Sequence, residues 1–343
     1  MGPWLSLALA AVLAPQDAGE RWQTFRFEVD VSLVLLNVVV TDGGRYVEGL
    51  EQDDFQLYED SRPQEISYFS WEGPQPEEQD LPSGDDQTVR YVRRLRGHSS
   101  RVVFIVFDTV GDLGNYSRSR SGARSFLERL AGPDDRVGLV FFSDFWRARV
   151  VEPTLDRDFL AEEIRRPRIT SFYQSDRDFG RTPGHSIYRQ LKYLIESVRT
   201  LQGRKIFVLV SEGLPLVDES DQRWLFSELT DTIDEANEKD ITIYTVDPSG
   251  LSAPGPGGVV RSAFLANQGS SELARRTGGL ALYNHNEMAR AFEMIDRDTR
   301  LFYTLGYMPR SDEGPARWRR IRVEVVGHPE YEVRTRTGYF AGF

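Results

Sequence analysis

The strongest constraint on the fold is a set of short apolar segments that alternate with helical patterns up to Arg300. The segments begin at Arg101, Asp135, Lys205 and Ile241, and they are apolar almost throughout. Strands of this kind are typical of a parallel sheet covered by helices on both faces. Between the segments, apolar residues recur at spacings of three and four, as on one face of a helix. The sequence therefore predicts a doubly wound, mostly parallel α/β sheet.

We place this α/β region at residues 101–299. A different pattern lies on both sides of it. Residues 20–72 and 300–343 carry short stretches of strand-forming residues separated by turn residues. Three strands alone rarely make a stable domain, so we expect the two sets to pair in one β-sandwich that contains or flanks the α/β region. Residues 73–100 have prolines and charges but little apolar periodicity, so we expect a linker there.

The first residues contain an apolar run from Trp4 to Ala14. This run has about half of the roughly 20 residues needed to span a bilayer, and it resembles the apolar part of a secretory signal peptide. We expect residues 1–19 to be a signal peptide and the protein to be exported to the periplasm or the cell exterior. A buried first helix is the alternative, because no Lys or Arg precedes the run. We expect no membrane span in the mature chain.

Composition excludes several classes of function. The 42 basic and 53 acidic side chains give a formal net charge of −11, which disfavours nucleic acid as a partner. Cysteine is absent, which excludes disulfides, thiolate metal sites and cysteine nucleophiles.

The motifs in the α/β region and its flanks resemble one family. They are Asp108 at a strand end, Ser211-Glu212-Gly213 after a later strand, Gly278-Gly279, the flanking stretches from Asp53 to Asp60 and from Phe302 to Pro309, and Gly338-Tyr339-Phe340. With these motifs, the chain from about Phe25 onward resembles the bacterial proteins, described from Acidobacteria, that are related to von Willebrand factor type A (VWFA) domains. The resemblance implies that the sheet is of the VWFA type.

The resemblance also implies a position for a metal site. The family's magnesium site uses an Asp-x-Ser-x-Ser strand end, a later threonine and a further aspartate, because this cation prefers oxygen ligands in octahedral array. When this chain is aligned with that pattern, Asp108 takes the position of the leading aspartate, and Val110 and Asp112 take the positions of the two serines. His185 takes the position of the threonine, for which the nearby Thr182 could substitute. Glu212 takes the position of the last aspartate.

These departures leave two interpretations of the site. Asp108, Asp112, His185 and Glu212 could hold a weakly bound divalent cation such as Mg, Mn or Ca, and an imidazole ligand would shift the preference toward manganese or zinc. Alternatively the chain holds no cofactor there, and Asp108 is a hydrogen-bonded carboxylate at a strand end. We favour the second interpretation, because Val110 removes an oxygen ligand.

No recognisable catalytic motif accompanies this site. The sequence has no Gly-x-Ser-x-Gly elbow, and its four histidines lack metal-ligand spacing. We therefore expect an exported, non-enzymatic protein whose VWFA-like face, built by the loops after Asp108, Phe142, Ser211 and Asp247, binds a protein partner. A hydrolase with an unrecognised site on that face and a structural scaffold or adhesin are the alternatives.

The expected export gives a direct test. Protein isolated from the native host should begin between about Pro15 and Glu20, because a signal peptidase cleaves after small residues such as Ala14 and Ala18. Amino-terminal sequencing measures this. An intact Met1 or Gly2 on protein from the cytosol would contradict export.

Overall fold

The computed structural model describes the chain in several stretches. They are residues 33–73, 101–108, 113–144, 147–166, 183–214, 216–218, 223–250, 259–283, 285, 287–309 and 317–341. The expected signal peptide, the start of the amino-terminal β region and most of the expected linker lie outside these residues.

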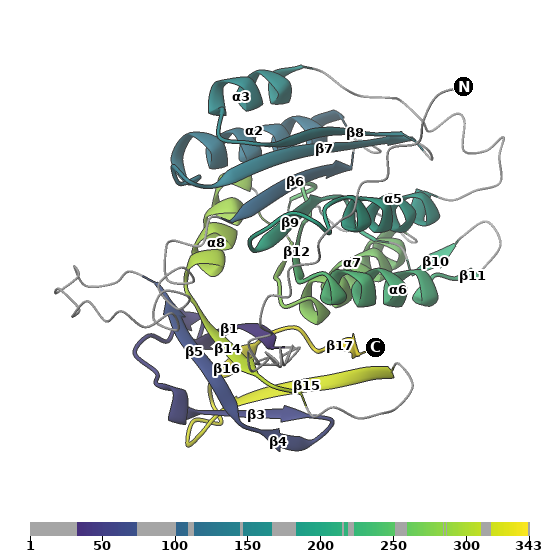
Figure 1. Ribbon diagram of the computed structural model, residues 1–343. Helices are drawn as coiled ribbons and strands as arrows, with labels where there is room; N and C mark the ends of the chain where they lie inside the picture. The colour runs from purple at the N-terminus through teal and green to yellow at the C-terminus, as the bar shows by residue number, and fades with distance from the viewer. Residues whose placement is uncertain are drawn as a thin grey trace, which may run out of the picture. The chain divides into compact units, whose positions relative to one another are not determined.

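One sheet carries the apolar strands of the central region (Figure 1). Its strands are β6 (Val102–Asp108), β7 (Arg136–Asp144), β8 (Arg147–Thr154), β9 (Lys205–Val210), β12 (Ile241–Val246) and β13 (Ala281–Leu282). They lie in the order β13-β12-β9-β6-β7-β8. All neighbours pair in parallel except β8, which runs antiparallel to β7.

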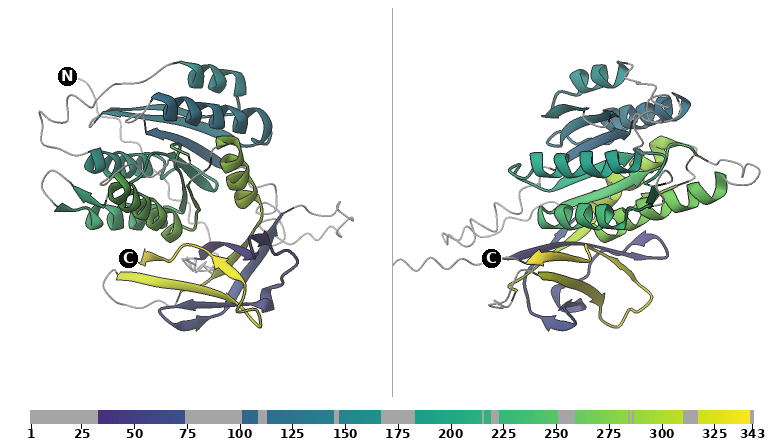
Figure 2. Two further views of the ribbon diagram at one scale, coloured as in Figure 1. Left: turned by 180° about the vertical axis from the view of Figure 1, so that it is seen from behind. Right: turned by 90° about the vertical axis from the view of Figure 1, so that its right-hand side faces the viewer.

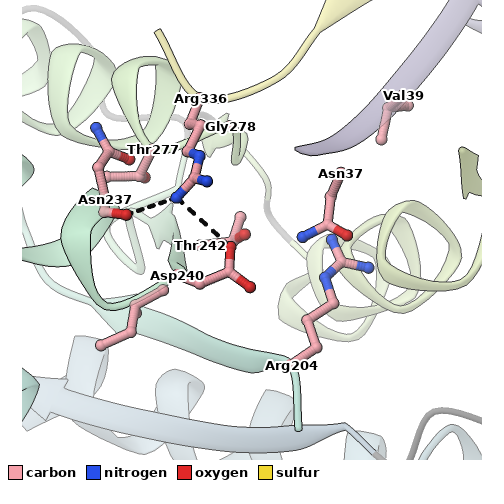
Figure 3. Close-up of a pocket in the computed structure, with 10 residues that line it drawn as sticks. Asn37, Val39, Arg204, Asn237, Asp240, Thr242, Thr277, Gly278 and Arg336 are labelled. Atoms are coloured by element: carbon pink, nitrogen blue, oxygen red, sulfur yellow. Dashed lines mark hydrogen bonds and ion pairs between the residues drawn. The ribbon is translucent and has the colours of Figure 1, made fainter. Parts of the chain in front are cut away.

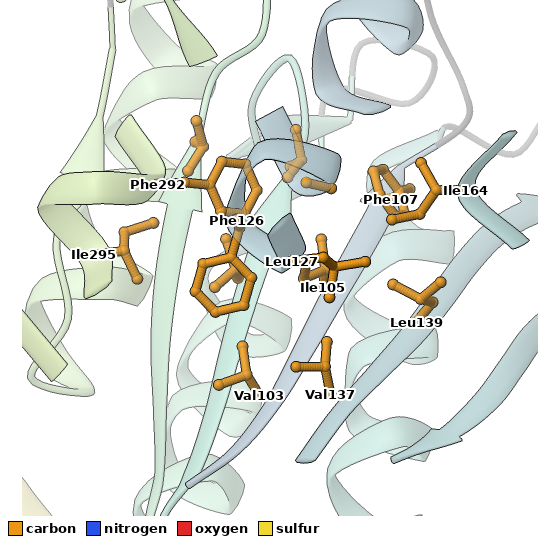
Figure 4. Packing of buried hydrophobic residues seen from close by; sticks show 14 of the residues in the cluster. Val103, Ile105, Phe107, Phe126, Leu127, Val137, Leu139, Ile164, Phe292 and Ile295 are labelled. Carbon is orange, nitrogen blue, oxygen red and sulfur yellow. The ribbon is translucent and has the colours of Figure 1, made fainter. Parts of the chain in front are cut away.

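Helices cover both faces of this mixed sheet. They are α2 (Leu113–Arg129), α3 (Arg157–Arg165), α5 (Pro183–Ser197), α6 (Phe226–Glu238), α7 (Val259–Arg276) and α8 (Met288–Arg300). Successive strand side chains point to opposite faces, so Ile105 and Phe107 pack with Phe126 of α2 and Phe292 of α8 (Figure 4). Phe104 of the same strand packs in the opposite layer with residues of α5 and α6.

Antiparallel strands form the β module, which surrounds a third apolar core. One sheet contains β1 (Val34–Asp42), β2 (Arg45–Tyr46), β5 (Ile66–Glu72), β14 (Phe302–Tyr307) and β16 (Glu332–Arg334), and the other contains β3 (Phe55–Glu59), β4 (Arg62–Gln64), β15 (Arg317–Val325) and β17 (Gly338–Ala341). The core between them includes Leu36, Phe55, Tyr303 and Val323. A short 3-10 helix, Gln52–Asp54, precedes β3, and a small hairpin of β10 (Val217–Asp218) and β11 (Arg223–Trp224) precedes α6.

The fold class expected from the sequence, a doubly wound and mostly parallel VWFA-like sheet in a β-sandwich, is wrong. In the described part of the chain, three of the four sheets are antiparallel throughout, and the strands of the β module curl as an incomplete barrel. Only one sheet contains parallel pairs, and that sheet is mixed. The sequence analysis missed β8. Its connection from Asp144 to Arg147 is too short for a parallel crossover, so β8 must return antiparallel beside β7.

Strands from both ends of the described chain pair with each other. β14 lies between β1 and β5, and Phe302 at its start is opposite Glu72 at the end of β5. β15 pairs with β3 in the second sheet. The chain therefore leaves the β module and returns to it at neighbouring positions, and α8 leads directly into β14 (Figure 2). The domain boundaries expected from the sequence stay a prediction, because pairing does not show which parts fold alone.

A buried carboxylate joins the helical layer to the β module. Asp298 of α8 is fully buried. It accepts hydrogen bonds from Tyr244 of β12 at 2.6 Å, from Tyr46 of β2 at 3.2 Å and from both terminal nitrogens of Arg334 of β16. This carboxylate therefore ties together four elements that are far apart in the sequence.

Replacing Asp298 should destabilise the protein strongly. Asp298→Ala leaves the Arg334 guanidinium buried without its acidic partner, and such a change costs about 3–5 kcal/mol of unfolding free energy. Glu128→Ala is the matched control, because Glu128 pairs with Arg124 on the exposed face of α2 and exposed pairs contribute about 0–1 kcal/mol. Chemical denaturation measures both variants. Equal losses in the two would contradict this role of Asp298.

Candidate functional site

The carboxyl ends of three parallel strands bring polar residues to one edge of the mixed sheet. Asp108 is the last residue of β6, while Ser211 and Asp247 directly follow β9 and β12. Backbone hydrogen bonds fix these ends: the Ser211 amide donates to Val246, and the Asp247 amide donates to Leu282. Ligands of sheets with parallel strands commonly bind at this edge.

Ser211 connects two of these strand ends. Its hydroxyl group donates a hydrogen bond to Oδ2 of Asp108 at 2.8 Å and accepts one from the Gly213 amide at 3.3 Å. Gly213 has a φ of 132°, a conformation that favours glycine. The turn after β9 is thereby held against the end of β6.

Glu212 is exposed, but its carboxylate is held in place. Asn115 of α2 donates from Nδ2 to Oε1 of Glu212 at 2.7 Å. The Asn115 oxygen in turn accepts a hydrogen bond from Arg118, whose guanidinium also donates to the Ser249 carbonyl oxygen at 3.0 Å. A chain of hydrogen bonds thus runs from the turn after β9, across α2, to the loop after β12.

Asp247 is a buried carboxylate at the same edge. Burial raises the pKa of Asp247, the hydrogen bonds from the Ser249 hydroxyl and amide lower it, and the negative charge of Glu212 raises it further. Arg118 opposes this effect by favouring the ionised form. We call Asp108, Asn115, Arg118, Ser211, Glu212, Asp247 and Ser249 the strand-end cluster.

The metal ligands expected from the sequence stay a prediction, because only some of them lie among the described residues. Asp108 and Glu212 lie at the same edge of the sheet, as members of the strand-end cluster. Asp112 and the substitute Thr182 lie outside the described residues. The backbone of His185 is in α5, but its side chain is also outside them.

The described residues do not fit a magnesium ion. An octahedral site needs several oxygen ligands, and no group of three or more His, Asp or Glu side chains that could hold a metal occurs in the described ranges. The Asp108 carboxylate accepts a hydrogen bond from Ser211, and that of Glu212 accepts one from Asn115. The two carboxylates therefore already have hydrogen-bond donors from the protein.

The sequence predicts a binding face at the loops after Asp108, Phe142, Ser211 and Asp247, but not the hydrogen bonds that order three of these strand ends. Phe142 lies within β7, which continues to Asp144. Ser211 was part of a recognised motif, and its position directly after a buried strand could have suggested a link to Asp108. Asn115 and Arg118 carried no such signal. Their spacing of three residues places them on one side of α2, but their partners come from loops distant in the sequence.

Comparisons with solved structures found similarity at low sequence identity. No protein-family profile and no curated protein matches the chain. Similar solved structures include an aerotolerance-related membrane protein from Bacteroides fragilis NCTC 9343, with 13% identity and a TM-score of 0.40 over 57% of this chain and 97% of that one. The mussel byssus proximal thread matrix protein 1 has 13% identity and a TM-score of 0.36, over 59% of this chain and 46% of that one.

The pilus adhesin SpaC from Lactobacillus rhamnosus GG, in an open conformation, has 10% identity and a TM-score of 0.41, over 71% of this chain and 44% of that one. The match thus spans less than half of the byssus protein and of the adhesin. Among the described helices, none is long and apolar enough to cross a bilayer.

From the strand-end cluster we expect metal ions to change the stability of the protein very little. Saturating magnesium should leave the melting temperature nearly unchanged, because the carboxylates already have partners in the protein. Asp108→Ala should lower the unfolding free energy by about 1–3 kcal/mol with or without magnesium, since it removes a hydrogen bond to a carboxylate and leaves the Ser211 hydroxyl the Gly213 carbonyl oxygen at 3.2 Å.

Thermal unfolding measures the stability of both proteins. Calorimetric titration with magnesium, manganese, calcium and zinc measures metal binding directly. A stoichiometric micromolar isotherm that disappears in Asp108→Ala would show that the chain has a working metal site.

Proposed function

We propose that the protein is an exported, non-enzymatic binding protein that holds a protein partner at the face of the strand-end cluster. The observation that carries this proposal is the ordered carboxylate of Glu212. It is exposed, yet it is held by Asn115, which Arg118 fixes in turn. A charged group that is ordered before binding loses less conformational entropy when a partner docks.

The chemistry of the cluster supports binding rather than turnover. The Ser211 hydroxyl links two strand ends by donating to Asp108. The Arg118 guanidinium bridges Asn115 and the loop after β12. These polar groups hold the loops of the face together, and the exposed Glu212 offers a partner a charge-assisted contact.

The sequence resemblance supports the same proposal. Asp108 at the end of β6 and Ser211-Glu212-Gly213 after β9 are among the motifs on which the resemblance to VWFA-related bacterial proteins rests. We include a distant relationship to that family in the proposal, with a face that has lost the family's magnesium ligands. The apolar run from Trp4 to Ala14 supports export.

Crosslinking at the proposed face tests this function. A photoreactive amino acid at position 212 should capture a partner from the native host's envelope fraction, whereas the same group at position 326 should not. Val326 is the matched control, because it is 57% exposed and follows β15 in the β module.

A charge reversal at position 212 measures how much this side chain contributes to the affinity for the partner. Once the partner is purified, Glu212→Lys should weaken its affinity at least tenfold, and Asn115→Ala should weaken it less, because Asn115 only orders Glu212. Isothermal titration measures both. Equal capture from positions 212 and 326, or unchanged affinity of Glu212→Lys, would contradict binding at this face.

A further inference from the structure

A small polar cavity lies where the mixed sheet meets the β module (Figure 3). Its volume of about 10 Å³ admits the centre of about one water-sized particle. Its walls come from β1, the start of β9, the α6–β12 turn, the end of α7 and the loop before β17, including Asn37, Arg204, Asn237, Asp240 and Arg336. We call it the joint cavity.

Arg204 is a cation in this wall without an acidic partner. In the described part of the chain, no carboxylate oxygen is paired with its guanidinium. One terminal nitrogen donates to the Thr299 carbonyl oxygen at 3.0 Å, and the guanidinium lies 3.9 Å from the centre of the Phe302 ring. Among the described residues, its Nε is shielded from solvent and has no acceptor. Burial lowers the pKa of Arg204, and the carboxylates of Asp298 and Asp240 oppose this effect only in part.

Arg336 brings a second cation to the same cavity. Its terminal nitrogens donate to the carbonyl oxygens of Asn237 at 2.6 Å and Leu35 at 2.9 Å. The nearest carboxylate is that of Asp240, at 3.8 Å, and it is half exposed. The Nε of Arg336 is also buried, and no described residue provides an acceptor for it. Two guanidinium groups therefore share one distant and partly solvated carboxylate.

The lining offers unused hydrogen-bonding groups for one small occupant. Asn237 is 1% exposed, and its amide nitrogen donates to the Arg276 carbonyl oxygen. Its Oδ1 has no donor among the residues that the structure describes. The two Nε–H groups of Arg204 and Arg336 are donors. Buried polar groups of this kind are nearly always satisfied in native proteins, by the protein itself or by a bound species.

We propose that the joint cavity binds a monatomic anion of the chloride class between Arg204 and Arg336. The anion accepts the two unused Nε–H groups and adds a second negative charge beside that of Asp240, so that two guanidinium groups face two negative charges. A water molecule is the competing occupant, because it could also donate to Oδ1 of Asn237. Water would leave the two guanidinium groups with the Asp240 carboxylate as the one negative charge among the described residues of the lining, and burying an incompletely balanced charge is costly.

A salt titration tests this site. Replacing sodium gluconate by sodium chloride at constant ionic strength should stabilise the folded protein with a saturable dependence. At ten times the dissociation constant, the unfolding equilibrium constant should fall about elevenfold. Arg204→Met should abolish this dependence, whereas Arg124→Met should retain it, because Arg124 lies on the exposed face of α2.

Crystals soaked in bromide locate the ion independently of any variant. An anomalous peak within hydrogen-bond distance of Arg204 and Arg336 is the expected result, and it decides the question even if Arg204→Met does not fold. Ordinary water density in the cavity of bromide-soaked crystals would overturn the proposal. The same chloride dependence in Arg204→Met and the native protein would overturn it as well.

Discussion

The arrangement of the described chain depends on the hydrogen bonds made to one buried carboxylate. Asp298 has no exposed surface, and its oxygens accept from two tyrosine hydroxyls and one guanidinium. These donors come from β2, β12 and β16, while the carboxylate comes from α8. The hydrogen bonds to Asp298 therefore form together only when the mixed sheet, its helices and the β module are all in place. Apolar packing favours compactness, but this network selects one relative placement of the parts.

The sequence predicted the elements better than it predicted their arrangement. The apolar segments from Arg101, Asp135, Lys205 and Ile241 correspond to β6, β7, β9 and β12, because strands buried on both faces must be apolar throughout. The antiparallel β8 was missed, since Arg147 and Arg149 interrupt its apolar pattern and its direction is set by a tight connection. The fold class was wrong for this reason, and because all described strands outside the mixed sheet pair antiparallel.

Only part of the candidate site could be predicted from the sequence. Asp108 was identifiable, because a carboxylate that ends a buried parallel strand lies at a ligand-binding edge. The hydrogen bonds of the cluster join residues that are about a hundred or more positions apart, as from Ser211 to Asp108 or from Asn115 to Glu212. Those of Asn115 and Arg118 also depend on which way α2 faces. Such contacts follow from tertiary structure and leave no periodic signal in the sequence.

The pairing of β5 with β14 has a mechanical consequence. The chain enters and leaves the mixed-sheet unit from neighbouring strands, with Glu72 opposite Phe302. Tension applied between Leu33 and Ala341 therefore acts first on the strands of the β module. While the ladder between β5 and β14 holds, part of this load passes across it from Glu72 to Phe302 and not along the peptide chain of the mixed sheet. The same ladder that closes the β module thus reduces the covalent load on the segment that carries the strand-end cluster.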